Sequence, residues 1–215
     1  MGRRSVCVPL LRRLPAYLRV LKNLEQDGRE WVTCSQLADT LKYHVVLVRK
    51  DIAACSSVKG RPKKGYRLAG LIADVERMLG YREPTDAVLA GLGRLGQAIF
   101  GYPGFEAYGI RIVAGFDVRQ VQVTPAGKGE VLPCGEIVPW CMSHGIRLGI
   151  IAVPQDAAQE VCDAMVRAGI KAIWNFAPAH LRVPDDVDVQ NENMAIPLAR
   201  LTKHLSARPD AGRGQ

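Results

Sequence analysis

The first eighty residues carry apolar side chains at alternating spacings of three and four, the period that lines one face of an α-helix. Leu14, Leu18 and Leu21 belong to the first such stripe, and Gly28 is a natural stop after it. The stretch "TCSQLADTLK" predicts a second short helix with Ser35 as its N-cap. The chain is therefore expected to begin with closely spaced helices.

The stretch "VVLVRKDIAAC", residues 45–55, predicts a third helix on which Arg49 and Lys50 emerge together. Its inner face is expected to hold Val45, Val46, Val48 and Ile52. A further apolar stripe in "LAGLIADVERMLG" predicts a connecting helix that ends at Gly80.

Short apolar runs and helical stripes alternate after residue 86. Ala87–Ala90 and Ile110–Asp117 are expected to be strands, and the helical stretch "QAIFGY" lies between them. Two more strands are expected in "RLGIIAVP" and "KAIWNFAP", joined by a helix capped by Asp156 and stopped by Gly169. This alternation predicts an α/β fold with a Rossmann-type, doubly wound parallel sheet.

With 215 residues, 48% hydrophobic and 23% charged, the chain has an ordinary globular composition and room for two modest domains. Its net charge of +8 is unevenly distributed: residues 1–82 hold 17 Lys and Arg against 7 Asp and Glu, and the remainder holds 12 against 14. A basic module of this kind is typical of DNA binding, and a membrane-surface helix is the alternative. The segment "YREPTD" marks the expected boundary between a domain of residues 1–82 and one of residues 83–192.

The Gly, Pro and Lys-rich stretch "VKGRPKKGYRL" follows three helices, which predicts a winged helix-turn-helix with its third helix in the major groove of double-stranded DNA. Arg49 can bind guanine O6 and N7 as a fork, whereas Lys50 suits a phosphate. The wing would carry four more cations, Lys59, Arg61, Lys63 and Lys64. For the Arg49–Lys50 pair, a solvated helix face is the alternative.

A glycine-rich loop runs from Gly91 to Gly96 between an expected strand and helix. In a G-x-G-x-x-G loop the first glycine makes the turn, the second lets a pyrophosphate approach, and the third lets helix and strand pack closely. Asp117 lies 21 positions after Gly96, where a carboxylate accepts ribose hydroxyls and repels the extra phosphate of NADP. NAD or NADH is the expected cofactor, although Arg119 could pair with that phosphate, and a plain turn role for Asp117 is the alternative.

Ligands of open α/β sheets bind beyond the carboxyl ends of the strands. Further cofactor contacts are therefore expected at Val153, Pro154, Asn175, Phe176 and Ala177. For Phe176, simple packing in the core is an equal alternative.

The six cysteines form no C-x-x-C pair, and no apolar run approaches the roughly 20 residues that span a bilayer. The N-terminus also lacks the apolar core of a signal peptide. A cytoplasmic protein without metal or membrane attachment is expected. Cys134 and Cys141 remain a candidate redox pair.

Seven strings occur in the order in which similar strings occur in the Rex family of redox-sensing transcriptional repressors: "RLPAYLRVL", "VRKDI", "GRLGQAIFGYPGF", "FDV", "VPQDAAQ", "AGIKAIWNFAP" and "VPDDVDVQN". The chain resembles this family from about residue 13 to residue 205. The resemblance implies a winged-helix domain fused to an NAD(H)-binding Rossmann domain. It also implies a homodimer on a palindromic operator, which NADH releases, so that the repressor reports the NADH/NAD ratio.

Carried over residue by residue, the resemblance assigns operator contacts to Arg49 and Lys50, and places Tyr102 near the nicotinamide. It assigns the dinucleotide to Gly91, Gly93, Arg94, Leu95, Gly96 and Asp117, and Leu92 lies within the same loop. The C-terminal helix, residues 193–206, has an apolar stripe formed by Met194, Leu198, Leu201 and Leu205. In the family this helix is swapped into the other subunit; residues 207–215 are expected to be a disordered tail.

Two positions depart from the family just before the swapped helix. Asn193 and Met194 stand where the family typically has an Asp and an aromatic residue. That Asp pairs with an Arg on the first helix, here Arg19, and the aromatic approaches the partner's nicotinamide. Asn193 cannot form the ion pair, so an altered or lost NADH response is an alternative. The wing and the residues after Asp51 also differ, which leaves operator preference open.

Two other functions stay open on the sequence alone. An NAD-dependent dehydrogenase would need an acid–base residue beside the nicotinamide, for which His180 is the candidate. The basic N-terminal domain would then be unexplained. A DNA-binding protein could also retain its Rossmann half only as a dimerisation platform.

Overall fold

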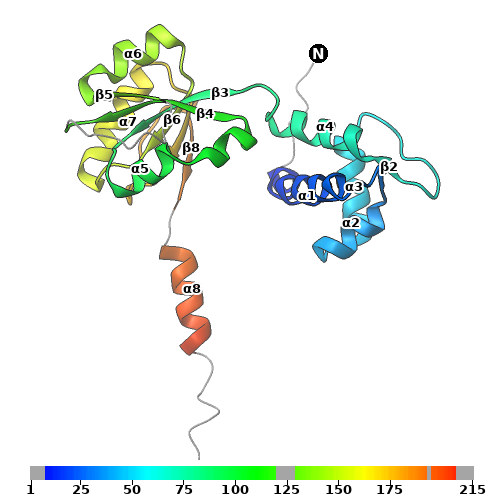
Figure 1. Ribbon diagram of the computed structural model, residues 1–215. Helices are drawn as coiled ribbons and strands as arrows, with labels where there is room; N and C mark the ends of the chain where they lie inside the picture. Colours follow the sequence, from blue (N-terminus) through cyan, green and yellow to red (C-terminus); the bar gives the residue numbers. More distant parts are fainter. Residues whose placement is uncertain (1–7, 120–128, 193–194, 207–215) are drawn as a thin grey trace, which may run out of the picture. The chain divides into compact units, whose positions relative to one another are not determined.

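The computed structural model describes residues 8–119, 129–192 and 195–206. The chain divides into two compact units, Met1–Glu83 and Pro84–Gln215, and Figure 1 labels most of their helices and strands. Each unit has its own apolar core, so each is described by itself.

The N-terminal unit packs four helices around one core, with a two-stranded sheet beside them. The helices are α1 (Val8–Gln26), α2 (Cys34–Leu41), α3 (Val45–Cys55) and α4 (Leu68–Leu79), and the antiparallel strands are β1 (Trp31–Val32) and β2 (Tyr66–Arg67). Leu14, Leu18 and Leu21 are buried in this core, as the apolar stripe predicts. The predicted stops at Gly28 and Gly80 both have the positive φ that favours glycine.

Two sequence-based details of this unit are wrong. Thr33, not Ser35, caps α2, because its hydroxyl accepts from the Gln36 N–H while the Gln36 side chain accepts from the Thr33 N–H. Val46, expected to face the core, is 47% exposed on α3, whereas Val48 and Ile52 are fully buried.

A buried carboxylate ties α3 to α1. Arg13 donates from Nε and Nη2 to the two carboxylate oxygens of Asp51 at 2.7 and 2.8 Å, and the Tyr17 hydroxyl donates to Oδ2 at 2.9 Å. Burial, followed by the hydrogen bond to Asp51, raises the pKa of Tyr17, so the phenol stays protonated as a donor. This network orients the helix that carries Arg49 and Lys50.

The second unit is a six-stranded parallel sheet in the order β5-β4-β3-β6-β7-β8. The strands are β3 (Thr85–Ala90), β4 (Ile110–Asp117), β5 (Glu130–Pro133), β6 (Leu148–Ile151), β7 (Ala172–Asn175) and β8 (Asp188–Asn191). Alternate residues of β3 enter two different cores: Ala87 and Leu89 face α5 (Arg94–Phe100), whereas Val88 and Ala90 face α6 (Ile137–His144) and α7 (Ala158–Arg167). Helices therefore cover both faces, which confirms the predicted doubly wound sheet.

The start of α7 differs from the prediction. A 3₁₀ turn, η3 (Gln155–Ala157), contains Asp156, and α7 begins after Ala157 without a side-chain cap. The strands β6 and β7 are also shorter than predicted, so Val153, Pro154, Phe176 and Ala177 lie in the loops that follow them.

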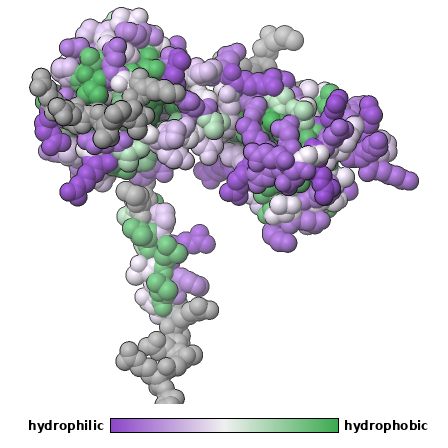
Figure 2. All heavy atoms as spheres, viewed as in Figure 1, coloured by the Kyte–Doolittle hydropathy of each residue, from purple (hydrophilic) through white to green (hydrophobic). Residues whose placement is uncertain are grey.

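The helix α8 (Ala195–Ser206) carries its apolar side chains in the open. Ile196, Leu198, Leu201 and Leu205 are each at least 60% exposed, and Figure 2 shows them as a hydrophobic stripe. Met194 and residues 207–215, for which expectations were given above, lie outside the described residues. Among the helices of the described chain, none has the length and apolar character needed to cross a bilayer.

The carboxylate network should contribute strongly to the stability of the N-terminal unit. Asp51→Ala leaves Arg13 without its partner in a mostly buried site, so we expect a loss of about 3–5 kcal/mol in the free energy of unfolding. Urea unfolding in a Trp140→Phe, Trp174→Phe background measures it, because Trp31 is then the only tryptophan. The control, Asp39→Ala on the exposed face of α2, should change stability by less than about 0.5 kcal/mol, and an equal effect of both substitutions would contradict the assignment.

Candidate functional site

The glycine loop of the second unit contains two close backbone contacts that leave no room for a side chain. Gly91 has φ +93°, and a Cβ there would lie 2.5 Å from the Ala152 carbonyl oxygen. A Cβ at Gly96 would overlap the Gly91 carbonyl oxygen, so its absence lets α5 lie directly against the end of β3. These glycines meet the requirements of the turn and of the helix–strand contact.

Gly93 differs from the other two glycines of the loop, Gly91 and Gly96. It is the N-cap of α5, with φ −68°, and a Cβ placed on it would meet no atom within 4 Å. The protein's own packing therefore does not require glycine at this position. An uncrowded backbone at a helix N-terminus is what close approach of a phosphate requires, and this observation fits a dinucleotide. Of the intervening residues, Leu92 is buried, whereas Arg94 and Leu95 are exposed.

Asp117, at the end of β4, is hydrogen-bonded to the backbone of this loop. Its Oδ2 accepts from the Leu92 N–H at 2.7 Å, and its Oδ1 accepts from the Arg119 N–H at 2.9 Å. Burial raises the pKa of Asp117, but the two backbone donors and the Arg119 guanidinium outweigh it and bring the pKa below its ordinary value. The Arg119 Nε lies 3.6 Å from Oδ1 and the side chain is exposed. The carboxylate is thus ionised and already organised beside the loop.

The other predicted cofactor residues lie at neighbouring strand ends. Asn175 is fully buried, its side-chain N–H groups donate to the Ala177 and Ala179 carbonyls and to Oδ1 of Asn191, and its own oxygen accepts from the Ala177 N–H. Its polar atoms therefore shape the loop after β7 from within. Of the rest, Ala177 is buried, Val153 and Phe176 are half-buried, and Pro154 is exposed.

Four aromatic rings form a series beside the α5 face of the sheet. Tyr102 meets Phe105 edge-on at 5.1 Å between centroids, Phe105 meets Trp174 at 5.8 Å, and Trp174 meets Phe176 at 4.6 Å. The Trp174 indole N–H donates to Oε1 of Glu192. Sequence reasoning found Tyr102 and Phe176 here but missed Trp174, because a tryptophan within a strand is equally typical of a core.

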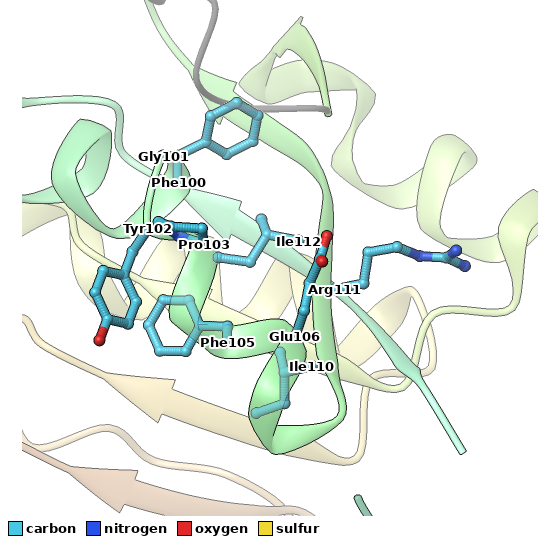
Figure 3. Close-up of a pocket in the computed structure, with 9 residues that line it drawn as sticks. All are labelled: Phe100, Gly101, Tyr102, Pro103, Phe105, Glu106, Ile110, Arg111 and Ile112. Atoms are coloured by element: carbon cyan, nitrogen blue, oxygen red, sulfur yellow. The ribbon is translucent and has the colours of Figure 1, made fainter. Parts of the chain in front are cut away.

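Figure 3 shows the small pocket at one end of this series, between Tyr102, Phe105 and the start of β4. Its volume is about 90 Å³, below the several hundred Å³ typical of small-molecule sites. A pocket of about 470 Å³ lies after β7 and β8, with His180, Asn191 and Glu192 among its lining residues. The larger pocket has the size of a ligand site.

The two cysteines proposed as a redox pair are both free thiols. Burial raises the pKa of Cys134, and it raises the pKa of Cys141 to about 11. Because thiolates are the reactive species, these environments disfavour redox chemistry at neutral pH. Within the described residues, no group of three or more His, Cys, Asp or Glu is arranged to hold a metal ion.

The N-terminal unit carries exposed cations at two places. Arg49 and Lys50 are exposed on α3, whose N-terminus is capped by Nδ1 of His44. The wing is a tight hairpin in which Arg61 and Gly65 exchange backbone hydrogen bonds of 2.7 and 2.9 Å. The cations of this hairpin and its approach, Lys59, Arg61, Lys63 and Lys64, are all exposed. The predicted DNA-contacting residues outside α3 are thus brought together in one loop.

One contact of this hairpin was missed by sequence reasoning. Two cations lie over the Trp31 ring: Cζ of Arg61 is 5.2 Å from the ring centroid, and Nζ of Lys64 is 5.7 Å from it. Thirty residues separate Trp31 from the wing, and no spacing rule connects them.

Of the predicted switch residues, Arg19 is exposed on α1, whereas Asn193 and Met194 lie outside the described residues.

Comparisons with known proteins agree with this two-part arrangement. A family model described as "Putative DNA-binding protein N-terminus" matches residues 5–53, and one described as "CoA binding domain" matches residues 82–179. The redox-sensing transcriptional repressor Rex of Treponema denticola is 37% identical over 90% of this chain and 92% of its own length. The repressor of the same name from Porphyromonas gingivalis is 38% identical over 94% and 92%.

Solved structures give the same result. A Rex-family repressor called RSP, in complex with NAD⁺ and operator DNA, matches 95% of this chain and 94% of its own with a TM-score of 0.87 and 30% identity. RSP in complex with NADH matches with a TM-score of 0.80 and 29% identity. These relatives are repressors rather than enzymes, so the dehydrogenase interpretation based on His180 is set aside.

The glycine loop generates a paired prediction on stability. Gly96→Ala forces a Cβ into the Gly91 carbonyl and should lower the free energy of unfolding by about 3 kcal/mol. Gly93→Ala meets open space at a permitted φ, and the lower entropy of its unfolded chain is offset by the poorer N-cap that alanine makes, so the free energy of unfolding should change by less than about 1 kcal/mol. Unfolding followed by Trp140 and Trp174 in a Trp31→Phe background measures both, and equal effects would contradict the geometry.

Proposed function

Because the chain belongs to the Rex family of redox-sensing transcriptional repressors, we propose that it binds operator DNA through its N-terminal unit and NAD(H) through its second unit. NADH binding would lower operator affinity, so that repression weakens as the cellular NADH/NAD ratio rises. The observation that carries this proposal is the loop in which Asp117 holds Leu92 while Gly93 leaves the α5 N-terminus uncrowded. A repressor that binds operator DNA works where the chromosome lies, so the proposed location is the cytoplasm.

The dinucleotide would lie across the carboxyl ends of β3 and β4. Backbone N–H groups at Gly93–Leu95 would bind the pyrophosphate, and the Asp117 carboxylate would accept the adenosine ribose hydroxyls. Val153, Pro154 and Phe176 would line the path toward the nicotinamide, with Tyr102 beyond. Asn175 and Ala177 would support this path from within the loop. The bound cofactor supplies a redox-dependent shape and charge, and the protein performs no chemistry on it.

The DNA contacts would come from α3 and the wing. Arg49 would read a guanine in the major groove, Lys50 would bind a phosphate, and the wing cations Lys59, Arg61, Lys63 and Lys64 would follow the backbone. The exposed stripe of α8 would be covered by a second copy of the chain, which makes the repressor a homodimer suited to a palindromic operator.

The first functional prediction concerns cofactor choice. NADH should bind more tightly than NADPH, and Asp117→Ala should narrow this gap, because it removes the ribose acceptor and the repulsion of a 2′-phosphate. We expect a loss of roughly 2–4 kcal/mol in NADH binding, measured by isothermal titration. Asp117→Asn is the control that can keep one oxygen for the Leu92 N–H while removing the charge. Equal affinity of the wild type for both cofactors would refute the assignment.

The second concerns DNA. Duplex affinity should fall steeply with salt, with a log–log slope on the order of −5 or steeper for several phosphate contacts per dimer. Arg49→Ala should cost about 1–3 kcal/mol on the operator and flatten the preference at one base pair per half-site. Lys64→Ala should weaken all sequences alike. An Arg49→Ala variant with intact sequence preference would contradict the groove assignment.

The third concerns the coupling between NADH binding and DNA binding. The residues before α8 favour a second candidate function, a Rex-like repressor with a weakened NADH response. Asn193 cannot pair with Arg19, and Met194 offers no ring to the nicotinamide, so NADH and DNA should oppose each other by less than the upper end of the usual 1–3 kcal/mol. Asn193→Asp with Met194→Phe should strengthen release. Operator affinity with and without saturating NADH decides the matter: a wild type that already loses a hundredfold, with no gain in the double variant, would contradict it.

A further inference from the structure

The wing is fixed to the N-terminal unit more firmly than its Gly, Pro and Lys composition suggests. At its start, the Ser57 N–H and hydroxyl donate to Oδ2 of the buried Asp74 at 2.6 and 2.8 Å. At its end, Gly65 has φ +82° and a Cβ on it would overlap the Val32 carbonyl oxygen. The hairpin is thus anchored at both ends, against α4 and against β1.

Two aromatic rings support the hairpin between these anchors. The Tyr66 ring faces Gly60, where a Cβ would lie 3.0 Å from Cε2. The Trp31 ring faces the two cations at the tip, Arg61 and Lys64. Because Val32 pairs with Tyr66 and Trp31 with Arg67 across the β1–β2 ladder, both rings belong to the same small sheet.

Holding two cations over one ring has a physical consequence. Arg61 and Lys64 carry like charges on one tight hairpin, and the negative face of an indole partly offsets their repulsion. Long cationic side chains also lose considerable rotamer freedom when a partner orders them. Side chains that already lie along a ring lose less on binding, so more of the phosphate interaction appears as affinity.

We propose that Trp31 is a positioning residue for DNA binding, which holds Arg61 and Lys64 on one face of the wing so that both meet backbone phosphates together. The inference rests on the proposed DNA-binding function. Trp31 acts here through the two cations and need not touch the duplex. Its contribution should therefore depend on their presence.

The test is a double-mutant cycle on the full-length protein. Duplex DNA binding, followed by fluorescence anisotropy over a salt series, is compared for wild type, Trp31→Phe, Trp31→Leu, Arg61→Ala/Lys64→Ala, and the latter with Trp31→Leu. Trp31→Leu should lower affinity about three- to ten-fold, and Trp31→Phe, which keeps a smaller π face, should lie between it and wild type. In the Arg61→Ala/Lys64→Ala background, Trp31→Leu should have no further effect.

A matched control separates positioning from folding. Trp140→Leu makes the same change at the Trp140–His144 stack on α6 of the other unit and should leave DNA affinity unchanged. Thermal unfolding of each variant reports the fold, and Trp31→Phe remains informative if Trp31→Leu is unstable.

Three outcomes would overturn the proposal. Wild-type affinity in both Trp31 variants would show that the ring does not position the wing. An equal loss from Trp31→Leu with and without the two cations would mean that Trp31 contacts DNA itself. A wild type without salt-dependent DNA binding would remove the proposed function and this inference together, whereas the first two outcomes leave that function intact.

Discussion

The contact between Gly96 and the Gly91 carbonyl is the constraint on which the nucleotide-binding unit depends. Any side chain at Gly96 would push α5 away from the Gly91 carbonyl at the end of β3. The next residue in the loop, Leu92, donates its N–H to Asp117, so the helix, the loop and the carboxylate meet at this one close contact. Gly93, which the packing does not require to be glycine, stays open for the proposed pyrophosphate contact.

The N-terminal unit solves a related problem with charge. The DNA contacts proposed for Arg49 and Lys50 require that α3 be held rigidly. Asp51, the next residue, turns inward to Arg13 and Tyr17 of α1. The outer face of α3 is cationic, and the helix is fixed by a buried polar network on its opposite face. Such a network is sensitive to the loss of any partner, because the remaining buried polar groups are then left unsatisfied.

Sequence reasoning predicted the elements with strong periodicity and the glycine loop, because each depends on local spacing. It missed the edge strands β5 and β8 and the helix α6, which have short or unpatterned sequences. It placed the α2 cap on Ser35 because it weighed residue type without the reciprocal partner Gln36. It also could not find the Trp31 contacts, since these arise from the pairing of β1 with β2 rather than from any repeat along the chain.

The two units can influence each other only through an element that both bias. A 12-residue helix such as α8, with four exposed large apolar side chains, is marginal alone in water and gains stability when that stripe is covered. In a homodimer the covering surface belongs to the partner, so the geometry of α8 becomes a property of the pair. A cofactor changes DNA affinity only as far as its contacts differ between two such geometries. On the proposed function, the residues that flank α8 in the sequence, rather than the glycine loop, would therefore set the strength of the redox response.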